Sequence, residues 1–219
     1  VVLTAQSGRS GVVVPVTAVD DDVVDGNQPC TIQTVVSSAD PHYNGMAMTD
    51  VNVTVQSEDV AGVTITPSAP IVREPNGATL ITVTLTSQPV APVQIALTST
   101  VPTECSVPAS VTLTAANWRT GVAVTVNALD DEYADGDQTC TIQTTATSSD
   151  PNYQNIAVAD PPVTVQDDDV ASVAVTPLSL TISEPNGASN FMLKLTSKPY
   201  LPVTIKWSSG DLSECRVGL

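Results

Sequence analysis

The side chains in this sequence best suited to chemistry are carboxylates gathered in short segments. The stretch LDDEYADGDQTC, from Leu129 to Cys140, carries five acids and no Lys or Arg. A triplet of aspartates ends the strand-like run VTVQDDD (163–169), and Glu74 lies in the turn sequence REPNG. Carboxylates brought together at one end of a fold repel one another unless a cation lies between them. Because Ca²⁺ takes about six to eight hard oxygen ligands from flexible loops, these acids predict a calcium site.

Catalytic groups are scarce by comparison. His42 is the single histidine, and the sequence contains no Ser-His-Asp set, nucleophile elbow or phosphate-binding loop. Asp135 and Asp137 could act as an acid–base pair, but they lie in a turn sequence that implies no pocket. The shortage of imidazole and of paired thiols argues against Zn²⁺ and Cu²⁺. We therefore expect a protein that is not an enzyme.

The charge balance excludes several classes of partner. Lys and Arg total 7 while Asp and Glu total 23, which gives a net charge of −16. Nucleic acids and anionic membrane surfaces attract basic proteins, so neither is an expected partner. The sequence also has no run of about 18 apolar residues, so we expect no membrane insertion.

The sequence repeats itself. VVLTAQSGRSGVVVPV from Val1 aligns with VTLTAANWRTGVAVTV from Val111, an offset of 110 residues. Roughly half of the aligned positions are identical, which indicates a tandem array. We divide the chain into the C-terminal half of one repeat (1–59), a complete repeat (60–169) and the N-terminal half of a further repeat (170–219).

The two half-repeats are not expected to fold alone, because half a sandwich exposes its core and its strand edges. Two explanations follow. The chain is a slice of a longer continuous array, which we favour because the cut falls in a loop. Alternatively, each chain completes its neighbour head to tail, as in donor-strand assembly.

Each repeat is predicted to be an all-β, immunoglobulin-like sandwich. Short alternating runs such as LITVTLTS, VQIALTS and GVAVTVNAL are separated by turn signals, which include Asn76-Gly77 and Asp135-Gly136. About seven such strands in roughly 110 residues are typical of this fold. Trp118 is most simply explained by packing in the core or at its rim.

The repeat also places the four cysteines. Cys30 aligns with Cys140 and Cys105 with Cys215, so the complete repeat holds the pair Cys105 and Cys140. We favour a disulfide between them, because a covalent cross-link within each repeat requires one pair of cysteines per repeat. The alternative is four buried free thiols. A disulfide implies an oxidising compartment. Asn52 begins the single N-glycosylation sequon, which lies in a strand-like run.

Three motifs of the repeat resemble those of the Calx-β family. TISEPNGASNFMLKLTS is similar to that family's opening strand, Ser-Glu turn and second strand, and VNALDDEYADGDQTCTI to its acid-rich loop. PVTVQDDDVASV is similar to its closing strand with terminal aspartates. The resemblance extends over the complete repeat and both halves. It implies tandem repeats in a large extracellular surface protein, with Ca²⁺ bound where the acid-rich loop and the triplet meet, at the join to the next repeat.

The resemblance also implies a ligand set. In the complete repeat the ligands would be Glu74, Asp130, Asp131, Asp135, Asp137, Asp167, Asp168 and Asp169. In the first half-repeat a weaker site would consist of Asp20, Asp21, Asp25, Glu58 and Asp59. Two departures stand out: Gln138 replaces a frequent acid of the family, and the loop TSTVPTECSV offers only Glu104.

An alternative to calcium is that the acids are solvated turn residues and charges that protect sheet edges. We favour calcium because three separate acid sets recur at fixed places in the repeat.

The sequence therefore predicts a structural repeat that builds a stiff extracellular stalk or filament, with Ca²⁺ at each junction. Its partners would be further copies of the repeat, in the same chain or head to tail. The linker QDDDVASV has no flexible Gly/Ser spacer, which fits this expectation. The alternative is an adhesive module at the cell surface that binds glycans or proteins, for which Tyr153, Tyr200 and Trp207 are candidate contact residues.

Overall fold

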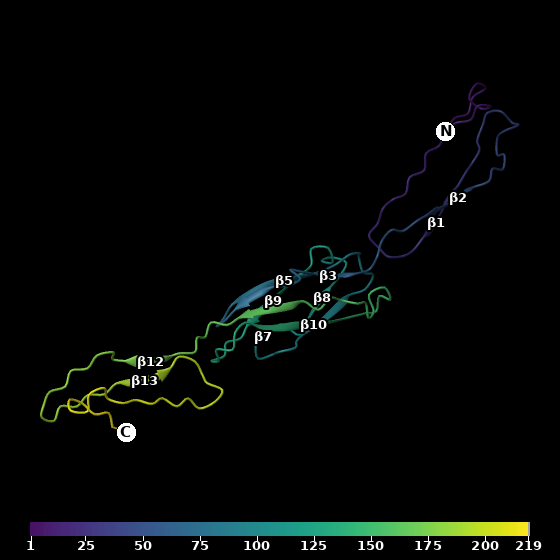
Figure 1. Ribbon diagram of the computed structural model, residues 1–219. Coiled ribbons are helices and arrows are strands. Elements are labelled where there is room, and N and C mark those ends of the chain that lie inside the picture. The colour runs from purple at the N-terminus through teal and green to yellow at the C-terminus, as the bar shows by residue number, and fades with distance from the viewer. Residues whose placement is uncertain (219) are drawn as a thin grey trace.

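The computed structural model describes residues 1–218, which form thirteen strands and no helix. A β-sandwich occupies the middle of an elongated molecule, and the chain continues from its two ends into less complete segments (Figure 1). No described residue belongs to a helix that could cross a bilayer. The all-β prediction is confirmed.

Nine strands lie within residues 60–169 and form two sheets. Their bounds are β3 (Val63–Thr66), β4 (Ile71–Arg73), β5 (Ala78–Leu85), β6 (Val93–Ser99), β7 (Cys105–Ser106), β8 (Ser110–Leu113), β9 (Val122–Ala128), β10 (Gln138–Ser148) and β11 (Pro162–Gln166). One sheet has the order β3-β5-β9-β7 and the other the order β4-β11-β10-β6-β8. All neighbours are antiparallel except β11 and β4, which are parallel.

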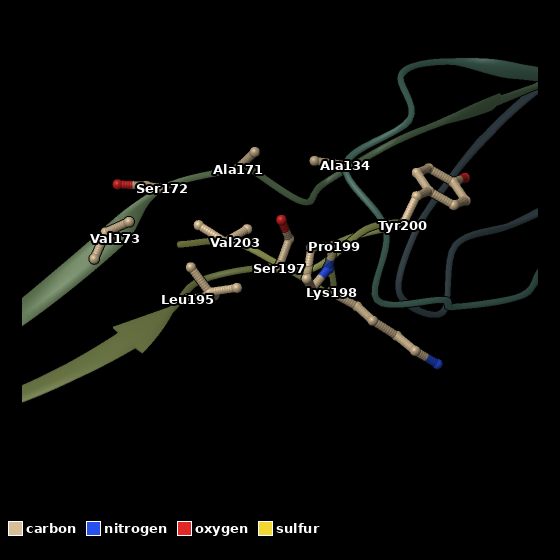
Figure 2. A pocket seen from close by; sticks show the side chains of 10 residues that line it. All are labelled: Ala134, Ala171, Ser172, Val173, Leu195, Ser197, Lys198, Pro199, Tyr200 and Val203. Atoms are coloured by element: carbon tan, nitrogen blue, oxygen red, sulfur yellow. The ribbon is translucent and has the colours of Figure 1, made fainter. Parts of the chain in front are cut away.

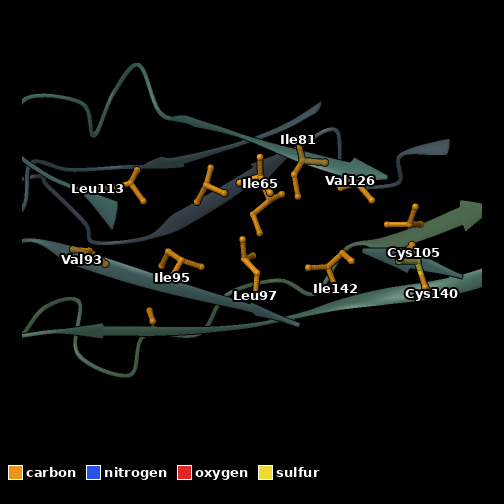
Figure 3. Packing of buried hydrophobic residues seen from close by; sticks show 14 of the residues in the cluster. Ile65, Ile81, Val93, Ile95, Leu97, Cys105, Leu113, Val126, Cys140 and Ile142 are labelled. Atoms are coloured by element: carbon orange, nitrogen blue, oxygen red, sulfur yellow. A yellow bond between two sulfur atoms is a disulfide. The ribbon is translucent and has the colours of Figure 1, made fainter. Parts of the chain in front are cut away.

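The core is a layer of aliphatic side chains between these sheets (Figure 3). Successive residues of a strand face opposite sides, so the alternating runs bury every second residue. On β5 the buried residues are Ile81, Val83 and Leu85, and on β6 they are Val93, Ile95 and Leu97. Each aliphatic side chain that is fully buried stabilises the fold by about 1.5–3 kcal/mol. Trp118 is buried with them, as expected.

The first strand of the repeat changes sheet partway along. β3 pairs with β5, whereas β4 pairs with β11 in the other sheet. Pro67 and Pro70 lie between the two segments, and proline has no N–H with which to continue a ladder. The carbonyl of Pro70 instead accepts a hydrogen bond from the Thr164 amide at 3.0 Å. This switch gives β4 its parallel partner and, as described below, positions an acidic residue.

The predicted disulfide between Cys105 and Cys140 is confirmed. Cys105 lies on β7 and Cys140 on β10, so the bond joins the two sheets, with the Cα atoms 6.4 Å apart (Figure 3). It closes a separation of 35 residues. On the loop-entropy estimate a bond of that span stabilises the fold by about 3–4 kcal/mol.

Tyr153 corrects an expectation. It is fully buried, so it cannot belong to an exposed adhesive patch. Its hydroxyl donates to the Ser87 carbonyl at 2.6 Å and accepts from the Ser87 amide at 3.2 Å. The carboxylate of buried Asp150 accepts hydrogen bonds from the amides of Val90 and Asn152, each at 2.9 Å. Tyr153 and Asp150 therefore tie the loop after β5 to the loop after β10.

The two half-repeats form one strand pair each. Residues 1–59 contribute β1 (Gln28–Ile32) and β2 (Val51–Val55), and residues 170–218 contribute β12 (Val173–Thr176) and β13 (Met192–Leu195). Both pairs are antiparallel two-stranded sheets. Asn52, the start of the sequon, lies within β2 and accepts a hydrogen bond from the Thr31 hydroxyl at 3.1 Å.

Candidate metal centre

The fold brings four acidic segments to one end of the complete repeat, which we call the acidic pole. Its members are Glu74 after β4, Glu104 before β7, the loop 129–137 between β9 and β10, and the triplet 167–169 after β11. β4 and β11 run parallel and therefore end at the same side of the sandwich. The Glu74 amide donates to the Gln166 carbonyl at 3.1 Å, next to the triplet.

Three carboxylates of the pole converge. Donor oxygens of Glu74, Asp130 and Asp168 all lie within 4.8 Å of one another. A Ca²⁺ ion binds each oxygen at about 2.3–2.6 Å, so two ligands of one ion lie up to about 5 Å apart. The spacing and the purely oxygen donor set therefore fit Ca²⁺. Glu74 is only 7% exposed, whereas Asp130 and Asp168 are exposed.

Hydrogen bonds join the loop 129–137 to the triplet. The Gly136 amide donates to the Asp167 carboxylate at 2.7 Å, and the Asp167 amide donates to the Asp137 carboxylate at 3.3 Å. Gly136 has a φ of 80°, which a side-chain residue rarely adopts. The Asp169 amide donates a hydrogen bond to the Asp167 carboxylate at 2.7 Å. Asp137 and Asp167 thus hold the loop in place, a role that the sequence did not reveal.

Two further aspartates of the predicted set lie in the same loop. The Asp131 carboxylate accepts a hydrogen bond from the Tyr133 amide at 2.7 Å, and the Asp135 carboxylate accepts one from the Tyr200 hydroxyl at 3.3 Å. Asp131 also lies close enough to Glu74 to affect its titration. The group of three does not include Asp131, Asp135, Asp137, Asp167 or Asp169.

Burial and mutual repulsion both disfavour the charged carboxylates of the pole. Burial, followed by the nearby charges of Asp131 and Glu104, raises the pKa of Glu74 from 4.5 to about 7. Burial and the charges of Asp131 and Asp135 likewise raise the pKa of Glu104. The single ion pair within residues 1–218 joins Arg119 to Asp22, so no acid of this pole forms an ion pair with a basic side chain there. A bound cation would remove this repulsion.

Glu104 belongs to the pole more closely than the sequence suggested. It is largely buried, its charge acts on Glu74, and its carbonyl accepts a hydrogen bond from the Leu129 amide at 2.8 Å. A usable signal was present in the repeat, because Glu104 aligns with Glu214 and each precedes a cysteine.

The first half-repeat holds a looser set of acids. Burial and the charges of Asp21, Asp20, Asp22 and Asp25 raise the pKa of Asp59. Across residues 1–218, the convergent group in the complete repeat has no counterpart among Asp20, Asp21, Asp25, Glu58 and Asp59. Asp22 is instead paired with Arg119 of the following repeat.

The loop 129–137 also contacts the next repeat, and the corresponding loop of the first half-repeat makes the same contact at its own junction. The Lys198 amide donates to the Glu132 carbonyl at 2.6 Å, and the corresponding Gln88 amide donates to the Asp22 carbonyl at 2.7 Å. At the second junction the rings of Tyr133 and Tyr200 are stacked with centroids 4.5 Å apart. The pole therefore lies where one repeat meets the next.

A cavity of about 330 Å³ lies beside the second junction (Figure 2). Leu195 and Val203 are among its lining residues. They align with Leu85 and Val93, which are buried core residues of the complete repeat. The cavity is therefore a part of an open sandwich interior rather than a ligand site.

Comparisons with known proteins show likenesses of fold. No family model and no curated protein matches the chain. Among solved structures, the apo-form Calx CBD1 domain is 18% identical with a TM-score of 0.38, over 51% of this chain and 100% of that domain. WR4, a C. elegans MSP family member, is 12% identical with a TM-score of 0.33, over 48% and 95%. The periplasmic chaperone SfaE is 12% identical with a TM-score of 0.37, over 49% and 58%.

These scores are too low to carry an argument about function. The sequence repeat and the strand topology together define a tandemly repeated β-sandwich, which contains a disulfide and has an acidic pole at the second junction.

Proposed function

We propose that this chain is part of an extracellular structural array in which Ca²⁺ at each acidic pole stiffens the join between β-sandwich repeats. The observation that carries the proposal is the convergence of Glu74, Asp130 and Asp168 beside the junction contact of Lys198 with Glu132. Glu74 and Asp130 precede that contact in one repeat, and Lys198 belongs to the next. An ion that fixes the loop 129–137 therefore fixes the carbonyl to which the next repeat is bonded.

The carboxylates of Glu74, Asp130 and Asp168 would bind the ion directly. Asp131 and Glu104 lie close enough to Glu74 to affect its charge. When bound, Ca²⁺ supplies positive charge and coordination rather than a chemical reaction. The disulfide supports an oxidising and hence extracellular location, because such bonds are rare in the cytosol.

Thermal unfolding with and without Ca²⁺ tests the proposal. A ligand that binds only the folded state raises stability by about 2.7 kcal/mol at a concentration of 100 Kd. We expect Ca²⁺ to raise the melting temperature relative to EDTA, and Asp168→Asn to abolish most of that rise. Glu132→Gln is the matched control, because it removes the same charge from the acidic pole at a residue outside the convergent group. Equal melting temperatures in Ca²⁺ and EDTA would rule the calcium function out.

Of the three residues suggested for the adhesive alternative, Tyr153 is buried, whereas Tyr200 and Trp207 are exposed. Tyr200 stacks on Tyr133 at the junction. Trp207 aligns with Leu97, a buried core residue. A glycan array remains the direct test of that alternative.

A further inference from the structure

We propose that one end of the complete repeat is a receptor for the acidic loop of the repeat before it, and that Arg119 supplies the positive charge which fixes that loop without metal. We call this end the donor face and define it by the Gln88 amide, the Arg119 guanidinium and the side-chain amide of Asn152. It lies at the end of the sandwich next to residues 1–59 (Figure 1). The proposal rests on the tandem array of the proposed function but not on its calcium.

The two neutral groups of the donor face hold the backbone of the preceding acidic loop. The Gln88 amide donates to the Asp22 carbonyl at 2.7 Å, and Asn152 Nδ2 donates to the Val24 carbonyl at 2.9 Å. Val23, which lies between these two acceptors, forms a parallel bridge with Gln88. The loop is therefore bonded to the complete repeat on both sides of Val23.

Arg119 provides the charge of the donor face. Its guanidinium forms an ion pair with the Asp22 carboxylate and lies over the Trp118 ring, 4.6 Å from the ring centroid. Trp118 is only 7% exposed, and its carbonyl accepts a hydrogen bond from the Leu85 amide at 2.9 Å. Contact with a ring fixed in the core restrains the Arg119 side chain, so less conformational entropy is lost when it pairs with the loop.

Opposite charges recur at the two paired positions of the repeat. The chain has only 7 basic residues, and Arg119 aligns with another of them, Arg9. Asp22 aligns with Glu132, so the acid that faces the arginine also recurs. Complementary charges at these positions are what recognition between successive repeats requires, because the donor face of one repeat meets the loop of the repeat before it.

The buried network of Tyr153 and Asp150 positions the two neutral donors. Ser87, whose carbonyl accepts the Tyr153 hydroxyl at 2.6 Å, directly precedes Gln88. The backbone amide of Asn152 donates to the Asp150 carboxylate at 2.9 Å. Both donors therefore lie on loops whose conformation is set by contacts inside their own repeat, and such preorganisation lowers the cost of binding the neighbour.

The donor face thus fits a partner of defined chemistry, a short loop that presents carbonyls on alternate residues and a carboxylate. Arg119 neutralises that carboxylate, as Ca²⁺ would neutralise the carboxylates of the acidic pole. The first junction therefore closes without metal. Added salt weakens it, because the side chains of Arg119 and Asp22 are 69% and 42% exposed and salt screens an exposed ion pair.

Amide hydrogen exchange in EDTA tests the proposal, because the junction itself protects the Gln88 amide. At low salt we expect Arg119→Gln to speed exchange of this amide by about two- to fivefold, the range of an exposed ion pair. The Lys198 amide at the second junction is the internal control and should exchange at an unchanged rate. Arg73→Gln is the matched variant, because it removes the same charge from the same repeat at the end next to Glu74.

Reversal of the two charges gives a sharper test. Arg119→Asp places like charges together and should speed exchange of the Gln88 amide more than Arg119→Gln does. Adding Asp22→Arg should restore slow exchange, because the ion pair forms again in reverse. Salt should speed exchange of this amide in the parent chain and in Asn152→Ala but not in Arg119→Gln.

Three results would overturn the proposal. The first is exchange of the Gln88 amide that Arg119→Gln leaves unchanged or that Arg73→Gln speeds equally. The second is failure of Asp22→Arg to restore slow exchange in the Arg119→Asp chain. The third is the same salt dependence in Arg119→Gln as in the parent. The calcium function fails by a different measurement, equal melting temperatures in Ca²⁺ and EDTA, and none of these exchange experiments contains calcium.

Discussion

At the scale of single residues, Glu74 shows how the fold alters an ordinary carboxyl. The parallel pairing of β4 with β11 fixes its backbone beside the aspartate triplet, and burial limits its contact with water. Its charged form is therefore disfavoured unless a cation is bound. The sequence predicted that Glu74 belongs with the loop and the triplet, because the motifs recur together. It could not predict which three carboxylates converge, since that depends on loop conformation.

Glu74 also predicts a pH dependence in the absence of metal. Its pKa in the folded state is about 7, against an ordinary value of 4.5. The neutral carboxyl therefore favours the folded state below the unfolded pKa, and that contribution is lost as the pH rises through 7. In EDTA we expect Glu74→Gln to flatten the fall in melting temperature between pH 5 and pH 8. Parallel pH profiles for the variant and the parent chain would contradict this prediction.

Tyr153 offers a second test at the same scale. Its hydroxyl is buried and bonded to both backbone groups of Ser87. Tyr153→Phe leaves those groups without a partner, and a buried polar group that loses its hydrogen bond costs about 1–3 kcal/mol. Urea unfolding should show this loss. Tyr43→Phe is the matched control, since Tyr43 aligns with Tyr153 but is exposed. Equal changes for both variants would exclude the proposed role of the buried hydroxyl.

At the scale of elements, alternation in the sequence was enough to predict a sandwich. Runs such as LITVTLTS and GVAVTVNAL become β5 and β9, with every second residue inward. The division of the first strand into β3 and β4 was not predictable from alternation, because both segments look alike as strands. Their sheet membership is decided by tertiary pairing with β5 and β11.

The disulfide makes a quantitative prediction for these elements. Cys105 and Cys140 join β7 of one sheet to β10 of the other. Replacing both with alanine should lower the free energy of unfolding by about 3–4 kcal/mol, mainly because the unfolded chain is no longer constrained. Urea denaturation measures the loss. The Cys30→Ser, Cys215→Ser variant is the control and should unfold as the parent does, because these two thiols are free and exposed. An unchanged free energy of unfolding in the double alanine variant would show that the disulfide does not stabilise the fold.

At the scale of the whole molecule, the junctions show what repetition adds. The period of 110 residues places Glu132 and Asp22 at corresponding positions, and their carbonyls bond Lys198 and Gln88 of the following repeat. This backbone contact could not be read from residue types, because any residue supplies the same amide and carbonyl. The side chains differ, with the Tyr133–Tyr200 stack at one junction and the Arg119–Asp22 ion pair at the other.

That difference leads to a prediction about stiffness. The convergent carboxylates lie at the second junction and have no equally close counterpart at the first, within residues 1–218. Ca²⁺ should therefore hold the Glu132 carbonyl in place and slow hydrogen exchange of the Lys198 amide, by a factor on the order of ten. The Gln88 amide is the internal control, and its exchange should slow much less. The measurement is amide exchange in Ca²⁺ and in EDTA. Equal slowing at both amides would show that calcium acts on the fold in general, and no slowing at Lys198 would show that it does not stiffen this junction.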